Sequence, residues 1–267
     1  MGRNFRQNGV TAHRGNPKDF PENTLAGFLD GIICGADWVE TDVLLTRDGI
    51  PVLCHDATTG RTADGDLRVS ESTLAELKEL DFSHSFRTSR GLDLQSCPRT
   101  SIPTLAEALE LFAWHRDVRF SIQLKADGIA SYVADVVRHW GMEGQVGFNE
   151  GSLARLLDIR KYLPGVYVFY DVYDKNTPVE DYISICLEHG FQELVMHHAG
   201  IDSEKCEKIR AAGIVAGAWN IGDECLMRRM LGAGVYRLYC DAPRVHLGLL
   251  EEMRKNEDRF DLNSKLG

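Results

Sequence analysis

Residues 38–45 carry two acidic side chains at a spacing that allows metal chemistry. The segment is mostly apolar and β-prone, so it is predicted to be a buried parallel strand. Glu40 and Asp42 are two residues apart, so both side chains leave the same face of that strand. Two buried carboxylates repel each other, and a divalent cation between them would relieve both the repulsion and the loss of solvation. Oxygen ligands of this kind predict Mg²⁺ or Ca²⁺; a structural ion pair with an arginine is the alternative.

Histidines and basic residues lie close to these acids in the sequence. His13 precedes the acidic strand and His55 follows it. Histidine titrates near neutral pH, so such a pair can supply a general acid and a general base. Arg14 directly follows the first histidine, and its forked guanidinium suits an anionic ligand. The region therefore predicts an acid–base catalytic site with a positive charge beside it.

The order of these residues resembles that of the glycerophosphodiester phosphodiesterase family. Its signature elements stand in this chain as His13-Arg14-Gly15, Glu22-Asn23-Thr24, Glu40-Thr41-Asp42, Asp48-Gly49 and His55-Asp56. They recur in order, and a weaker similarity extends over nearly the whole chain. The resemblance implies a metal-dependent hydrolase that splits glycerophosphodiesters into glycerol 3-phosphate and an alcohol such as choline or ethanolamine.

The resemblance also implies roles for individual side chains. His13 and His55 would transfer the protons, and Arg14 and Lys125 would lie beside the phosphate. Trp219 ends a predicted strand, where it would either wall the glycerol moiety or only plug the top of a barrel. Whether a substrate hydroxyl attacks first, through a cyclic phosphate, or water attacks directly is left open.

Gln123 departs from the family pattern, which has a glutamate at this position. Gln123 and Lys125 are two apart and share a strand face. The amide oxygen of Gln123 can still bind a cation as the third ligand, but the site loses one negative charge. We therefore expect weaker or altered cation binding. A barrel that binds phosphodiesters without turnover is an alternative.

The charge of the chain limits its partners. A formal net charge of −10 over 267 residues argues against broad binding of nucleic acid or of anionic membranes. We expect a small-molecule phosphodiester substrate, whose negative charge the site must offset locally. A sphingomyelinase-D-like or lysophospholipase-D-like barrel acting on lipid is the second enzyme hypothesis. It would require an apolar rim, and no aromatic membrane loop is evident.

Cysteine usage and hydropathy indicate the compartment. The seven cysteines are scattered and form no Cys-x-x-Cys pair, which predicts reduced thiols and a cytoplasmic location. Cys54 is beside His55, but adjacent strand residues face opposite ways, which argues against a nucleophile. No apolar run reaches membrane-spanning length, and residues 1–10 are too polar for a signal peptide. A start in which Met1-Gly2 replaces a removed signal is the alternative.

Strand and helix signals alternate along the whole chain. The predicted strands are residues 10–13, 38–45, 118–125, 145–149, 166–169, 193–196, 214–219 and 236–240. The predicted helices are residues 25–33, 105–112, 129–137, 152–162, 179–189, 203–212, 223–231 and 245–254. Eight strands, each followed by a helix, predict an α/β protein with a closed (β/α)8 TIM barrel, as one domain over residues 1–267. A doubly wound open sheet is the alternative.

Residues 57–103 interrupt the alternation. The segment is too long for an ordinary loop, so we predict a small insertion after strand two, over the barrel mouth. It should contain a short helix near residues 73–80. Its candidate lid residues are Phe82, His84, Phe86 and Arg87, which could also serve only to pack the insertion onto the rim.

Overall fold

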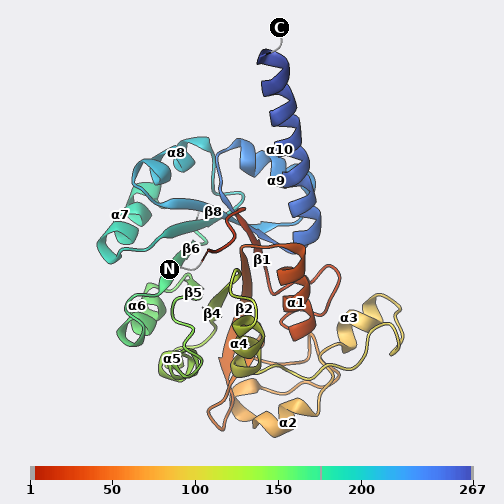
Figure 1. Cartoon of the computed structure of the whole chain (residues 1–267). Coiled ribbons are helices and arrows are strands. Elements are labelled where there is room, and N and C mark those ends of the chain that lie inside the picture. The colour runs from red at the N-terminus through yellow and green to blue at the C-terminus, as the bar shows by residue number, and fades with distance from the viewer. Residues whose placement is uncertain (1–3, 175, 266–267) are drawn as a thin grey trace.

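The apolar segments predicted as strands form the wall of a closed barrel in the computed structural model, which describes residues 4–174 and 176–265 (Figure 1). Its eight parallel strands are β1 (Val10–Ala12), β2 (Trp38–Leu45), β4 (Arg119–Leu124), β5 (Val146–Glu150), β6 (Tyr167–Val172), β7 (Glu193–His197), β8 (Val215–Ile221) and β9 (Arg237–Cys240). Strand β1 pairs with both β2 and β9, and this closes the ring. The predicted (β/α)8 barrel is confirmed, and the open doubly wound sheet is wrong. An additional strand, β3 (Pro51–Leu53), pairs antiparallel to β2 outside the ring.

Helices connect the strands and cover the outside of the barrel (Figure 1). They are α1 (Leu25–Cys34), α4 (Leu105–Ala113), α5 (Ala130–His139), α6 (Leu153–Tyr162), α7 (Val179–His189), α8 (Ser203–Ala211), α9 (Glu224–Gly232) and α10 (Pro243–Lys265). Helix α1 begins where the Thr24 hydroxyl accepts a hydrogen bond from the Gly27 N–H, and it ends at Gly35, whose φ of +104° favours glycine. Within the described ranges, no helix combines the length and apolarity needed to cross a bilayer.

The segment between β3 and α4 contains three short helices. They are η1 (Val69–Glu71), α2 (Leu74–Lys78) and α3 (His84–Ser89). Helix α2 coincides with the predicted helix and begins with a capping box formed by Thr73 and Glu76. Helix α3 was not predicted, because Phe86 is its one apolar residue and it therefore shows no apolar stripe. A separate apolar cluster, which includes Val69, Leu77 and Phe82, packs this segment against β2 and β3.

The amino-terminal end of the barrel is closed by a buried charge cluster. Arg237 lies between Asp37 and Glu193, with N–O distances of 3.1 Å and 3.2 Å, and all three side chains are almost fully buried. The two carboxylates hold the pKa of the Arg237 guanidinium above its ordinary value, although burial opposes this. These residues join the start of β9 to the starts of β2 and β7, which are distant in sequence.

Replacing this arginine should destabilise the fold strongly. In Arg237→Met, Asp37 and Glu193 stay buried without a cation, and breaking a buried pair in this way costs about 3–5 kcal/mol. We expect a lower midpoint of urea unfolding, followed by tryptophan fluorescence. Arg228→Met removes the exposed pair with Glu224 and is the matched control, with the midpoint unchanged. Equal midpoints for the two variants would contradict the prediction.

Candidate active site

The carboxyl ends of the barrel strands surround one pocket of about 230 Å³. Six residues predicted from the sequence line it: His13, Arg14, Glu40, His55, Gln123 and Trp219. The other two lie directly beside it. Asp42 follows Glu40 by two residues on β2, and the Lys125 ammonium is 3.6 Å from Asp42 and 2.9 Å from the Gln123 amide oxygen. The fold thus brings together all eight residues, which lie on or directly after five strands, β1, β2, β3, β4 and β8.

Glu40 and Asp42 point to the same side of β2, and neither side chain is more than 2% exposed. The Arg14 N–H donates to Glu40 over 2.9 Å, and the Arg14 Nε is 3.2 Å from Asp42. Burial and the charge of Asp42 raise the pKa of Glu40. Burial acts in the same direction on Asp42, but the positive charges of Arg14 and Lys125 hold its pKa below the ordinary value.

Two residues adopt left-handed backbone conformations beside these acids. Arg14 has a φ of +51° and Asn23 a φ of +53°, which is uncommon for residues other than glycine. The Asn23 amide donates to Asp42 over 2.9 Å, and its oxygen accepts from the Thr41 hydroxyl over 2.7 Å. In the sequence Asn23 stands out only as a member of the Glu22-Asn23-Thr24 element; the structure shows that it holds the Asp42 carboxylate.

Each histidine is held by a carboxylate at its Nδ1 atom. For His13 the partner is Asp241 at 2.7 Å, and for His55 it is Asp56 at 2.6 Å. The Nε2 atom of His13 is 3.9 Å from Glu40. Burial lowers the pKa of His13, but the bond to Asp241 and the charge of Glu40 outweigh it, so the pKa is raised. Burial lowers the pKa of His55. The negative charge of Asp42 acts to raise this pKa but does not outweigh the burial.

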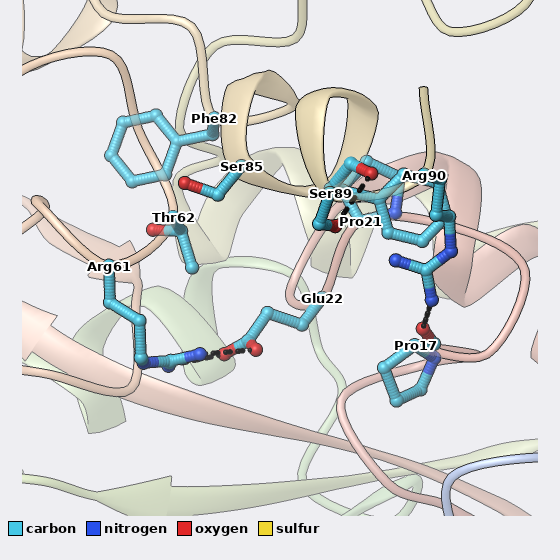
Figure 2. Close-up of a pocket in the computed structure, with 10 residues that line it drawn as sticks. Pro17, Pro21, Glu22, Arg61, Thr62, Phe82, Ser85, Ser89 and Arg90 are labelled. Carbon is cyan, nitrogen blue, oxygen red and sulfur yellow. Dashed lines mark hydrogen bonds and ion pairs between the residues drawn. The ribbon is translucent and has the colours of Figure 1, made fainter. Parts of the chain in front are cut away.

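Arg61, which belongs to the insertion, contacts the carboxylate partners of both His55 and Arg14. Its guanidinium donates twice to Glu22, at 2.7 Å each (Figure 2). Its Nε donates to Asp56. Glu22 in turn accepts from Arg14 over 3.1 Å. A continuous chain of charges therefore runs from His55 through Asp56, Arg61 and Glu22 to Arg14.

A second cavity, of about 270 Å³, lies between the insertion and the loop before α1 (Figure 2). Phe82 and Phe86, two of the candidate lid residues, line it. Arg87 does not: it is buried and pairs with Asp81 inside the insertion. For Arg87, packing of the insertion is therefore the better interpretation.

Several residues of the pocket were not predicted from the sequence to have a role. They are Asn149, Asp171, Tyr173, Asn220 and Tyr239. Asp171 lay beyond the predicted strand 166–169, whereas β6 continues to Val172. The alternation of inward and outward side chains would have placed Asp171 on the same face as Phe169, had that strand been predicted at full length.

The donor chemistry at the mouth fits a hard divalent cation. Glu40, Asp42 and Gln123 offer oxygen ligands, and the Oδ1 atom of Asp42 is buried without a hydrogen-bond partner in the described chain. Across residues 4–174 and 176–265, no three His, Cys, Asp or Glu side chains gather closely enough to hold a metal ion. A cation here would therefore depend on the Gln123 amide in addition to the two acids.

The chain is similar in sequence to a family of known proteins. The sequence model of the glycerophosphoryl diester phosphodiesterase family matches residues 13–245. A glycerophosphodiester phosphodiesterase from Bacillus altitudinis is 30% identical over 253 residues, which cover 92% of this chain and 99% of that protein. One from Caldanaerobacter subterraneus subsp. tengcongensis is 29% identical, covering 91% and 98%.

A solved structure is also similar. It is that of an Oleispira antarctica phosphodiesterase in complex with the product sn-glycerol-3-phosphate. It superimposes with a TM-score of 0.78 and 26% sequence identity, and the match covers 92% of this chain and 97% of that one.

Cys54 lies beside His55 but should be unreactive. Its side chain packs in the apolar cluster of the insertion, and burial raises the pKa of its thiol to about 12. At pH 8 almost none of it is thiolate, the form that reacts. Iodoacetamide at pH 8 should modify the exposed Cys225 and leave Cys54 intact, as read by peptide mass spectrometry. Unfolding in urea is the control that exposes Cys54; its rapid alkylation in the folded protein would contradict the prediction.

Proposed function

This chain belongs to the glycerophosphoryl diester phosphodiesterase family and is a phosphoric diester hydrolase, and on that premise we propose how it acts. It hydrolyses a small glycerophosphodiester to glycerol 3-phosphate and an alcohol, with His13 and His55 as general acid and base and with a bound divalent cation. The observation that carries the proposal is that both histidines, Arg14 and Glu40 line one pocket. The product named in the Oleispira antarctica complex supports the same substrate class.

The two histidines supply the proton transfers. Because each Nδ1 atom is engaged by a carboxylate, each Nε2 atom is the one left to exchange a proton with the substrate. One imidazole takes a proton from the attacking oxygen as it bonds to phosphorus, and the other gives a proton to the departing alkoxide as its P–O bond breaks. The attacking oxygen is that of water, or that of a substrate hydroxyl, in which case water opens the resulting cyclic phosphate in a second step. A general catalyst of this kind typically contributes ~10²–10⁴-fold to the rate.

The basic residues offset the charge of the phosphodiester. Arg14 and Lys125 are the cations nearest to the two acids, and each pairs with Asp42. Their guanidinium and ammonium groups can each donate to a phosphoryl oxygen. This local positive charge makes an anionic substrate compatible with a chain of net charge −10.

Glu40, Asp42 and Gln123 are the residues that would hold Mg²⁺ or Ca²⁺. When bound, the cation would polarise the phosphoryl group and hold a substrate hydroxyl or a water. Trp219, whose ring lies 4.7 Å from that of Tyr173, would form an aromatic wall for the glycerol moiety. We also propose that the insertion, residues 57–103, covers the mouth of the barrel. The contacts of Arg61 with Glu22 and Asp56 support this role. A cytoplasmic location is part of the proposal, supported by the free cysteines.

The activity is tested with a soluble and a lipid substrate. We expect hydrolysis of glycerophosphocholine in the presence of Mg²⁺ or Ca²⁺, its loss on addition of a chelator, and little release of choline from lysophosphatidylcholine. His13→Ala and His55→Ala should each lower kcat by ~10²–10⁴-fold with an unchanged circular dichroism spectrum. His139→Ala, at an exposed position on α5, is the control. Release of choline from lysophosphatidylcholine alone would indicate a lipid phosphodiesterase. No turnover of either substrate would indicate a binding protein. Either outcome would refute the proposal.

Gln123 is tested by restoring a carboxylate. Gln123→Glu adds a negatively charged oxygen ligand, and ligand charge is a main determinant of affinity for Mg²⁺ and Ca²⁺. We expect the affinity for the cation, measured by isothermal titration calorimetry, to rise about tenfold. Gln95→Glu makes the same change at an exposed position and should leave the affinity unchanged. An unchanged affinity in Gln123→Glu would count against Gln123 as a ligand.

A further inference from the structure

Asp171 is a buried acid in the pocket that the mechanism above does not use. It lies near the end of β6, opposite the charged residues of β1 and β2, and its side chain lines the pocket that contains both histidines. It is 6% exposed. Its Oδ2 atom receives only two long contacts, of 3.4 Å each, from the amides of Gln123 and Asn149. Its Oδ1 atom is buried and has no hydrogen-bond partner in the described chain.

On the side of β6, β8 and β9, three other polar atoms of the same pocket are also buried and unpartnered within the described residues. They are the Trp219 Nε1, the Asn220 Oδ1 and the Tyr239 hydroxyl. Buried polar groups are nearly always hydrogen-bonded, so four such atoms around one cavity indicate a polar ligand. Two of them, Asp171 and Tyr239, belong to side chains that are more than nine-tenths buried.

The arrangement does not favour a cation bound directly by Asp171. The amide nitrogen of Asn149 lies between Asp171 and Glu40, 3.4 Å from the first carboxylate and 3.5 Å from the second. The Ser121 hydroxyl donates to the Asn149 amide oxygen over 2.8 Å, which turns the NH₂ group toward the carboxylates. A donor therefore occupies the space in which a shared cation would have to lie.

A hydroxyl group matches these atoms better than an organic cation. Aromatic rings and a carboxylate also suit a quaternary ammonium ion. However, the Trp219 N–H donates only and needs an acceptor, which such a cation does not provide. A hydroxyl both donates and accepts, so it can satisfy Asp171 and Trp219 alike. The pocket, at about 230 Å³, is below the roughly 300–1,000 Å³ of sites for drug-sized ligands, which favours a small polyol.

We propose that Asp171 and Tyr239 form a hydroxyl-binding subsite that holds the glycerol end of the substrate. This inference rests on the proposed function, because it places the phosphate on the side of Arg14 and His13 and the polyol on the side of β6 and β9. The subsite selects diesters that carry a free hydroxyl, and the alcohol head group lies outside it.

The test compares substrates with and without the hydroxyls. We expect Asp171→Asn to lower kcat/KM about 10- to 100-fold for glycerophosphocholine and equally for glycerophosphoethanolamine. The same variant should change kcat/KM for bis(4-nitrophenyl) phosphate, which has no hydroxyl, less than about threefold. Tyr239→Phe removes only a hydroxyl and should act in the same direction. Glu150→Gln changes a buried acid of β5 that does not line the pocket and is the matched control, with no effect on any substrate.

Other outcomes would overturn the subsite. An equal loss on all three diesters would indicate a general structural or catalytic role for Asp171. A loss confined to the choline substrate would assign it to the head group. Weaker Mg²⁺ binding by Asp171→Asn in calorimetry, with substrate preference unchanged, would assign it to the cation.

A binding measurement separates this inference from the proposed function. Calorimetry with glycerol 3-phosphate and with inorganic phosphate needs no turnover. A selective loss of glycerol 3-phosphate binding in Asp171→Asn would support the subsite even if wild type hydrolysed no glycerophosphodiester. Equal binding of both ligands by wild type and variant would refute the subsite while leaving an active enzyme intact.

Discussion

The negative charge of Glu40 and Asp42, buried together on β2, is the constraint on which the mouth of this barrel depends. Water cannot solvate either carboxylate, so neighbouring groups must balance their negative charge. Arg14 contacts both acids, one through its backbone N–H and the other through its guanidinium. The left-handed backbone at Arg14 is explained by this double contact. Burial and the charge of Asp42 raise the pKa of Glu40, whereas Arg14 and then Lys125 hold the pKa of Asp42 down, so the two acids acquire opposite shifts.

The same charge balance extends outward to the histidines and the insertion. His13 is fixed by Asp241, and His55 by Asp56. Arg61 then joins Asp56 to Glu22, the partner of Arg14. The insertion is therefore connected to His55 and to Arg14 through charged contacts, in addition to its own apolar packing.

The two sides of the pocket differ in character. On the side of β1, β2 and β4, nearly every polar group is charged and paired. On the side of β6, β8 and β9, the polar atoms alternate with aromatic rings, and four of them lack a partner within the described chain. An asymmetric ligand fits such a pocket, with an anionic end on the first side and a neutral, hydroxyl-bearing end on the second.

The sequence by itself determined the charged side of the site and the fold that carries it. Glu40 and Asp42 share a face because strand side chains alternate, and His13 and His55 lie within the same contiguous unit, so short-range order was enough. Eight alternating strand and helix signals predicted the barrel. Helix α3 and the last three residues of β6 escaped prediction, because α3 has no apolar stripe and the acidic Asp171 interrupts the apolar run of β6. Only the tertiary structure decided that Asp241 meets His13 across 228 residues and that Asp171 and Tyr239 face the same pocket. Periodicity fixes which way a side chain points along one strand, whereas closure of the barrel fixes which strands it faces.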